Sequence, residues 1–365
     1  MKMSADRKRR VLVAVAVVAI ATCVSAVWVG LRVGGAGSVR DFDDTATALA
    51  ALVATGFCVR AALRHRGQMR LFWSLLAGAT LCWTLAEVTW AVYELVLRMS
   101  VPVPSWADLG YLGAVPFAVA ALLCHPAMNR AARRRARSLF DSLIVATALV
   151  FLSWTLVVGP LWHSTDLSTL GGLVAIAYPF GDVVIVFFIL SAVRERTGVN
   201  RLALWCLLAG LLMMALSDST YTYLTTTNSY ATGNLIDVGW IAAYLTIALA
   251  AFSSEPSTVR QWRTQATDAP TRASFLAPFV PAVVALGVAG FELELGHHLD
   301  RAATLMALGL VVLVLGRQTL LALEAATLVD SKEGHSLRAL IRVALGRPTV
   351  ATPKQGRSRD ATAPS

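Results

Sequence analysis

Ten stretches of about 20 largely apolar residues divide this 365-residue chain. A helix needs roughly 20 such residues to cross the hydrocarbon core of a bilayer. The stretches are continuous rather than alternating, which favours membrane helices over the strands of a β-barrel. The sequence therefore predicts an all-α, polytopic helical membrane protein with about ten transmembrane helices. They cover residues 11–31, 45–63, 71–96, 107–124, 139–161, 170–193, 202–223, 236–253, 275–293 and 302–322.

The composition supports this interpretation. Hydrophobic residues make up 56% of the chain and charged residues only 15%, whereas a soluble domain has roughly 45–50% and about 25%. The net charge of +10 would suit a nucleic-acid-binding protein if the basic residues formed one surface. They are instead scattered in short clusters between the apolar stretches, so we expect no nucleic-acid partner and interpret them as topology signals.

Lysine and arginine in short loops favour the cytoplasmic side of the membrane. With the N-terminus inside, the cytoplasmic segments hold 28 of the 32 Lys and Arg residues, and the other side keeps only Arg32, Arg40, Arg98 and Arg301. The arginine-rich segment 130–137 is expected to bind anionic lipid headgroups. We therefore expect a multi-pass protein of the bacterial plasma membrane with both termini in the cytoplasm. The first apolar stretch is too long for a typical signal peptide, so an uncleaved helix is expected there.

Similar short motifs recur along the middle of the chain. Asp108-Leu-Gly-Tyr and Asp237-Val-Gly-Trp begin two predicted helices, and the preceding helices carry Glu87 in Leu-Ala-Glu-Val-Thr-Trp and Asp218 in Leu-Ser-Asp-Ser-Thr-Tyr. Ala-Val-Pro-Phe at 114–117 and Ala-Tyr-Pro-Phe at 177–180 repeat as well. These motifs predict three related helical hairpins, at about 71–124, 139–193 and 202–253, within a transmembrane domain of residues 1–322.

Ionisable side chains inside a membrane are costly and usually face the interior of a helix bundle. Most of the intramembrane acids lie near the predicted outer face, and aromatic residues accompany them. Aromatic residues also form interfacial belts, which is the alternative explanation for their position. The pattern predicts an outward-facing acidic and aromatic pocket for a small amphipathic or cationic ligand. Its expected residues are Glu87, Trp90, Asp108, Tyr111, Asp182, Asp218, Tyr221, Asp237 and Trp240.

Several chemistries are not expected. All four Lys lie outside the predicted helices, the five Cys form no C-x-x-C pair, and no P-loop or Gly-x-Ser-x-Gly motif is present. His297 and His298 adjoin Glu294 and Asp300, but adjacent histidines point apart on a helix. The sequence thus indicates neither an enzyme nor a cofactor or metal site.

Beyond the last predicted helix, residues 323–347 form an amphipathic pattern with Leu337, Leu340, Ile341 and Leu345 on one stripe. This pattern predicts cytoplasmic juxtamembrane helices that would contact the inner leaflet, a second copy of the chain or a cytoplasmic signalling partner. Residues 348–365 are rich in Pro, Ser, Thr, Ala and charge, a composition typical of a disordered tail.

The motifs around Glu87, Asp108, Asp182, Asp218 and Asp237 resemble the N-terminal multi-pass membrane sensor module of actinobacterial GGDEF/EAL cyclic-di-GMP signalling proteins. The resemblance covers roughly residues 40–330 and implies a sensory architecture. The chain after residue 330 contains no Gly-Gly-Asp-Glu-Phe or Glu-Ala-Leu motif, so no cyclase or phosphodiesterase activity is implied. A sensory or regulatory protein is the leading interpretation. A proton- or ion-coupled small-solute transporter and a helix-packing scaffold are the alternatives.

Overall fold

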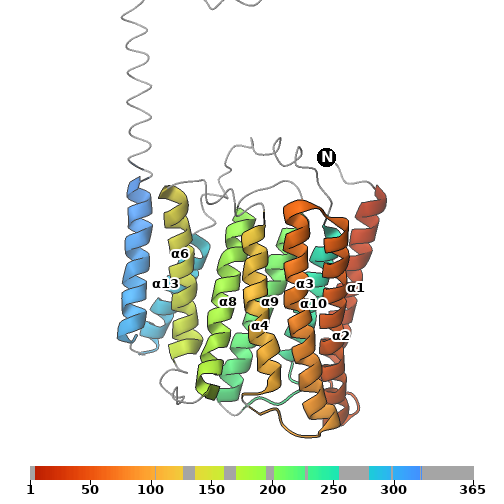
Figure 1. Ribbon diagram of the computed structural model, residues 1–365. Helices are drawn as coiled ribbons and strands as arrows, with labels where there is room; N and C mark the ends of the chain where they lie inside the picture. Colours follow the sequence, from red (N-terminus) through yellow and green to blue (C-terminus); the bar gives the residue numbers. More distant parts are fainter. Residues whose placement is uncertain are drawn as a thin grey trace, which may run out of the picture. The chain divides into compact units, whose positions relative to one another are not determined.

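The computed structural model describes residues 5–102, 104–125, 136–159, 170–194, 201–226, 229–254, 279–296, 299–320 and 322. These residues form helices and connecting turns without a β-strand, which confirms the predicted all-α class (Figure 1). The helices are α1 (Ala5–Gly30), α2 (Gly35–Arg64), α3 (Gly67–Ala91), α4 (Trp106–Cys124), α6 (Ala136–Ser153), α8 (Leu170–Arg194), α9 (Arg201–Thr226), α10 (Asp237–Ser253), α13 (Phe279–Glu294) and an unlabelled helix, Arg301–Leu320.

Seven of these helices are long and apolar enough to cross a membrane: α1, α2, α3 with its π-helical end, α4, α8, α9 and Arg301–Leu320. The other three, α6, α10 and α13, are shorter. Each predicted apolar stretch contains a helix, and the polytopic membrane-like architecture is confirmed. The number of ten crossings remains a prediction for the three shorter helices.

Two helices continue into a π-helical turn. The first, η1 (Val92–Val96), follows α3, and the second, η2 (Trp154–Val158), follows α6. Such turns often occur at functional sites because the extra residue per turn redirects side chains. In η1 the turn contains Glu94, whose Oε1 accepts a 2.7 Å hydrogen bond from the Thr232 hydroxyl.

The start of α2 differs from the prediction. The helix begins at Gly35 rather than near residue 45, so Asp43 and Asp44 are helical rather than part of a loop. The predicted apolar stretch began at residue 45, because hydropathy does not record which way a side chain faces. Both carboxyl groups point into the bundle, where Asp43 is 3% exposed and Asp44 is 5% exposed.

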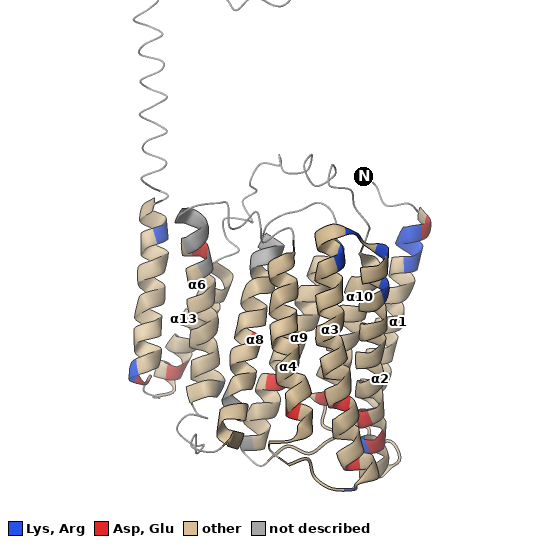
Figure 2. Cartoon of the chain, viewed as in Figure 1, with Lys and Arg blue, Asp and Glu red and all other residues tan. Residues whose placement is uncertain are grey.

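The charges separate along the bundle, as Figure 2 shows. Arginines gather where α1 begins, where α2 ends and where α3 begins, and we call this the basic end. The acids of α2, α3, α4, α9 and α10 lie toward the other end, which we call the acidic end. This separation agrees with the charge distribution between loops from which the topology was predicted.

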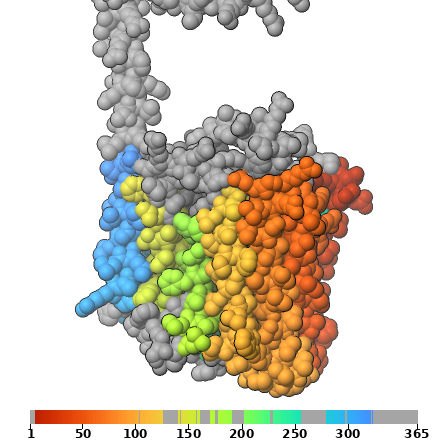
Figure 3. All heavy atoms as spheres, in the orientation of Figure 1, coloured from red at the N-terminus to blue at the C-terminus, as the bar shows by residue number. Residues whose placement is uncertain are grey.

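The chain divides into two compact units, residues 1–314 and 315–365. Within the first unit, the main core joins α2, α3, α4, α8, α9 and α10. Alanines such as Ala51, Ala54, Ala79 and Ala118 are fully buried there and let the helices approach closely. A second core joins α6, α13 and the helix that begins at Arg301. In Figure 3, α3, α4 and α8 lie side by side on the visible face.

Each of the three predicted hairpins consists of helices that contact each other: α3 with α4, α6 with α8, and α9 with α10. Two motif glycines explain how the first and third pairs pack. A Cβ added at Gly110 would lie 2.7 Å from the Cys82 carbonyl oxygen of α3, and one added at Gly239 would overlap the Ser217 hydroxyl of α9. At Gly110 the obstructing atom is backbone, so only glycine fits there, whereas at Gly239 a Cβ would require the Ser217 hydroxyl to rotate away. The predicted juxtamembrane helices (323–347) and tail (348–365) lie outside the described residues.

Candidate functional site

A cavity of about 460 Å³ lies among the helices of the main core. Its walls come from α2, α3, α4, α8, α9, α10 and the α3–α4 and α9–α10 connections. Along each core helix the cavity residues lie nearer the acidic end than the buried apolar residues. On α9, for example, the apolar core extends from Leu204 to Met214, whereas the cavity wall extends from Met214 to Thr225. The main core therefore separates the cavity from the basic end.

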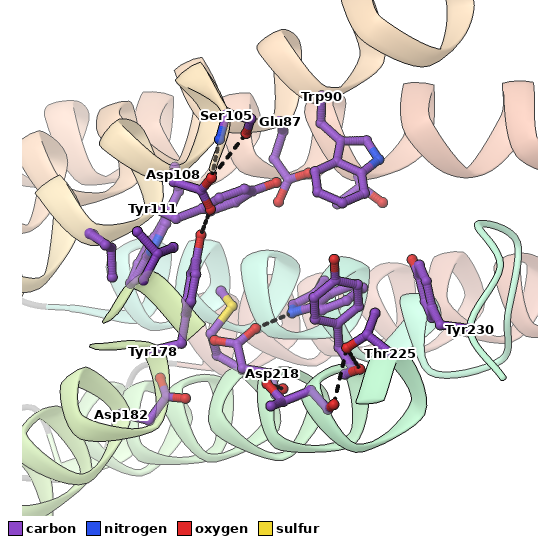
Figure 4. Close-up of a pocket in the computed structure, with 18 of the residues that line it drawn as sticks. Glu87, Trp90, Ser105, Asp108, Tyr111, Tyr178, Asp182, Asp218, Thr225 and Tyr230 are labelled. Atoms are coloured by element: carbon purple, nitrogen blue, oxygen red, sulfur yellow. Dashed lines mark hydrogen bonds between the residues drawn. The ribbon is translucent and has the colours of Figure 1, made fainter. Parts of the chain in front are cut away.

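Eight of the nine predicted site residues line this one cavity, although they are distributed over five helices. Figure 4 labels six of them, Glu87, Trp90, Asp108, Tyr111, Asp182 and Asp218, around a common space. Asp237 is the exception: it is only 1% exposed and does not border the cavity. The eight lining residues are Glu87, Trp90, Asp108, Tyr111, Asp182, Asp218, Tyr221 and Trp240.

Asp108 organises the beginning of α4. Its Oδ2 accepts hydrogen bonds from the Ser105 backbone N–H at 2.5 Å and from the Ser105 hydroxyl at 3.1 Å. A carboxylate here stabilises the helix because the first turn has unsatisfied N–H groups and a positive partial charge. The Tyr178 hydroxyl of α8 donates a short hydrogen bond to Oδ1 of the same side chain, so Asp108 also joins α4 to α8 (Figure 4).

Asp237 has the corresponding role in α10. Its Oδ2 accepts hydrogen bonds from the backbone N–H groups of Gly233 and Asn234, both at 2.8 Å, and its Oδ1 accepts one from the Tyr230 hydroxyl at 3.1 Å. Burial, followed by the negative charge of Asp237, raises the pKa of Tyr230 well above its usual range. The hydroxyl therefore keeps its proton and acts as a donor. Asp237 is thus a structural acid behind the wall of the cavity.

Glu87 and Asp218 occupy equivalent places in the first and third hairpins. The Tyr244 hydroxyl donates to Glu87 Oε1 at 2.8 Å, and Tyr111 faces the same carboxyl group. The indole N–H of Trp240 donates to Asp218 Oδ1 at 2.6 Å. In both hairpins, the aromatic residue that follows the motif glycine reaches the acid of the preceding helix. This agreement gives the repeated motifs a common structural role.

Aromatic rings form a continuous wall on the α9 side of the cavity. Tyr221 lies edge-on to Trp90, Tyr230 and Trp240, with ring centroids 6.2, 4.7 and 5.7 Å apart. Trp83 and Tyr244 lie where the cavity meets the main core, with their centroids 6.1 Å apart. Edge-to-face packing of this kind holds rings in fixed orientations. The rings therefore present a rigid surface to anything in the cavity.

Sequence reasoning missed four important residues. Asp43 and Asp44 line the cavity but precede the predicted apolar stretch 45–63 and were not among the expected site residues. Tyr178 and Tyr244 stood among the aromatic residues near the acids, yet their hydrogen bonds to Asp108 and Glu87 join residues 70 and 157 positions apart. The sequence did contain one signal for the two tyrosines, because Tyr178 in Ala-Tyr-Pro and Tyr244 in Ala-Tyr-Leu occupy the same position of a repeated motif. The spacing of Asp43 and Asp44 offered none.

The ionisable side chains that line the cavity are all acidic among the described residues. None of the described residues that line it is a lysine, an arginine or a histidine, whereas six are acids and eight are Trp or Tyr. The described residues also contain no group of three or more His, Cys, Asp or Glu that would hold a metal ion. His297 and His298 lie outside the described part of the chain. The carboxyl groups are therefore spread around the wall rather than gathered about one point.

Comparison with protein families, curated proteins and solved structures finds no match to this chain.

Proposed function

We propose that this chain is an integral membrane protein of sensory or regulatory type that binds a small organic cation in the cavity. The observation that carries the proposal is the lining itself: six acids and eight aromatic rings, with no basic residue among the described lining residues. Carboxylates pair with cationic groups, and aromatic faces attract them through the ring quadrupole. A volume of about 460 Å³ suits a small organic molecule.

The chemistry of the lining favours an organic cation over a metal ion. A metal ion draws several oxygen ligands to one point, and the described acids do not converge in that way. An alkylammonium or a similar group instead uses separate carboxylates and aromatic faces around an apolar body. The cavity provides both kinds of surface.

A sensory role is supported by where the cavity ends. The buried core of α2, α3, α4, α8, α9 and α10 lies between the cavity and the basic end. A ligand that contacts all six helices shifts them toward the arrangement that binds it best. The resemblance to sensor modules supports the same role. In this proposal the basic end faces the cytoplasm, where residues 323–347 would contact a second copy or a signalling partner.

The proposal is tested by binding measurements on the purified protein in lipid nanodiscs. Because Trp83, Trp90 and Trp240 line the cavity, a bound cation should change tryptophan fluorescence. We expect alkylammonium ions to bind and alcohols or carboxylates of the same shape not to. Glu87→Gln should weaken binding. Glu294→Gln should not, because Glu294 is an exposed residue of α13 outside the cavity. Equal responses to cations and to neutral isosteres would refute the proposal.

One observation favours a second candidate, a proton-coupled carrier. Asp182 and Asp218 form a hydrogen-bonded pair in the cavity wall, and a hydrogen bond between two carboxyl groups requires a proton on one of them. Intramembrane carboxyl groups are common in proton relays. Amine uptake into reconstituted vesicles, driven by a pH step, separates the candidates, because a sensor moves no net substrate.

A further inference from the structure

The acids of the cavity wall form two groups on different helices. The first group, which we call the α2 acids, consists of Asp43 and Asp44, and Asp43 also hydrogen-bonds to Asp237. The second group, the α8–α9 acids, consists of Asp182 and Asp218. Negative charge is therefore concentrated in two places rather than one.

The two groups lie toward different ends of the site. In Figure 4, Asp182 and Tyr230 are at opposite ends of the labelled residues. Tyr230 donates its hydroxyl to Asp237, which is the partner of Asp43, so Tyr230 marks the side of the α2 acids. Glu87 is positioned between the groups, because its carboxyl group is close enough to interact with an acid of each.

The open hydrogen-bonding capacity of the wall is found in these two groups. Asp43 Oδ1, Asp44 Oδ2 and Asp182 Oδ2 are buried and accept no hydrogen bond from an N–H group or a hydroxyl of the described residues, while Asp43 and Asp182 each also contact a second carboxyl group. Asp43 and Asp44 are themselves at least nine-tenths buried. By contrast, the other two acids of the lining accept hydrogen bonds from neighbouring side chains: Asp108 from Ser105 and Tyr178, and Glu87 from Tyr244. Buried carboxylate oxygens normally have partners, and an ammonium group supplies three donors.

The wall between the two groups is largely aromatic. Tyr221 packs edge-on against both Tyr230, on the side of the α2 acids, and Trp240, whose indole N–H donates to Asp218. Ring faces cover methylene groups favourably and hold no charge that an alkyl chain must avoid. A molecule that fits this wall is apolar in the middle and cationic at both ends.

We propose that the occupant is a linear organic diamine, with one ammonium group at the α2 acids, the other at the α8–α9 acids and its alkyl chain along the aromatic wall. This inference rests on the proposed function, since it identifies the class of cation that the cavity binds. Two charged ends explain why the carboxyl groups with open oxygens form two separate groups. A monoamine would leave one of the two groups without a partner.

The test is isothermal titration of the protein in nanodiscs with α,ω-diaminoalkanes from propane to octane, each beside the monoamine of the same chain length. We expect affinity to peak at one chain length and the best diamine to bind at least about tenfold more tightly than its monoamine. Asp182→Asn should lower diamine affinity to that of the monoamine and leave a monoamine held by the α2 acids unaffected. Glu294→Gln is the matched control and should change neither affinity.

The outcomes separate this inference from the proposed function. If diamines and monoamines bind equally, or if chain length has no effect, the diamine inference is wrong while cation binding stands. If no amine binds, the proposed function fails as well. Should Asp182→Asn not fold, Asp44→Asn tests the other group: it should remove the same diamine advantage, and an unchanged advantage in that variant would refute the inference.

Discussion

The close approach of α3 and α4 depends on the absence of a side chain at Gly110. A Cβ at this position would lie 2.7 Å from the Cys82 carbonyl oxygen and 2.8 Å from the Ala86 Cβ. Both distances are well below van der Waals contact, and the first atom belongs to rigid backbone. Gly110→Ala must therefore push the two helices apart, and overpacking of this kind costs about 1–3 kcal/mol of folding free energy.

The same helix supplies a matched control. Gly113 is one turn along α4, and a Cβ there would meet nothing within 4 Å. Gly113→Ala should instead stabilise the helix by about 0.5–1 kcal/mol, because alanine loses less backbone entropy than glycine. The two alanine variants should thus differ in unfolding free energy by roughly 1.5–4 kcal/mol, with opposite signs relative to the unmodified protein.

The assay is reversible unfolding in mixed micelles of a mild detergent and dodecyl sulfate, followed by tryptophan fluorescence. The variants share composition, so differences in detergent binding cancel. Equal unfolding free energies for Gly110→Ala and Gly113→Ala would refute the reasoning, because they would mean that α3 and α4 are not in contact at Gly110. A loss of stability in Gly113→Ala alone would refute it as well.

Three further predictions follow from individual contacts. Tyr244→Phe removes the 2.8 Å hydrogen bond to buried Glu87, so it should lower unfolding free energy by about 1–3 kcal/mol, and an unchanged value in denaturation would argue against the bond. Trp154→Phe removes the 2.9 Å bond to the partly buried Asp300 and should cost less, about 0.5–1.5 kcal/mol in the same measurement. Burial lowers the pKa of His65 below its usual 6.5. The folding stability should therefore be complete above about pH 6.5 and should fall as the pH drops toward the folded-state pKa of His65. His65→Gln should flatten that part of the stability–pH curve, and an unaltered curve would contradict the assignment.

Much of the fold was predictable because each membrane helix corresponds to a long apolar stretch of the sequence. The sequence placed α4 at 107–124 and α9 at 202–223, and the structure has them at Trp106–Cys124 and Arg201–Thr226. The beginning of α2 was not predictable in this way. Its acids lower the local hydropathy whether they face lipid, water or the bundle interior, and only the packed structure distinguishes these surroundings.

The site residues also divide into those that the sequence identifies and those that only the packed structure places. Glu87, Asp108 and Asp218 were identifiable because an acid inside an apolar stretch is costly and must face other protein. The placement of Asp237 could not be judged, because its motif matches that of Asp108 while its carboxyl group faces a turn instead of the cavity. Local sequence reports that a carboxyl group is inside the bundle but not which of its neighbours surrounds it.

The small residues of the main core, next to the cavity, determine how ligand binding in the cavity can change the rest of the protein. Ala51, Ala54 and Ala118 let the helix backbones approach closely, and the larger core side chains such as Leu76 and Ile247 are tightly buried among them, so little space is left for single side chains to swing aside. A response to a ligand must therefore move entire helices as rigid bodies. A mechanical readout, such as the changing separation of probes at the far tips of α2 and α10, is thus the natural way to watch this protein respond.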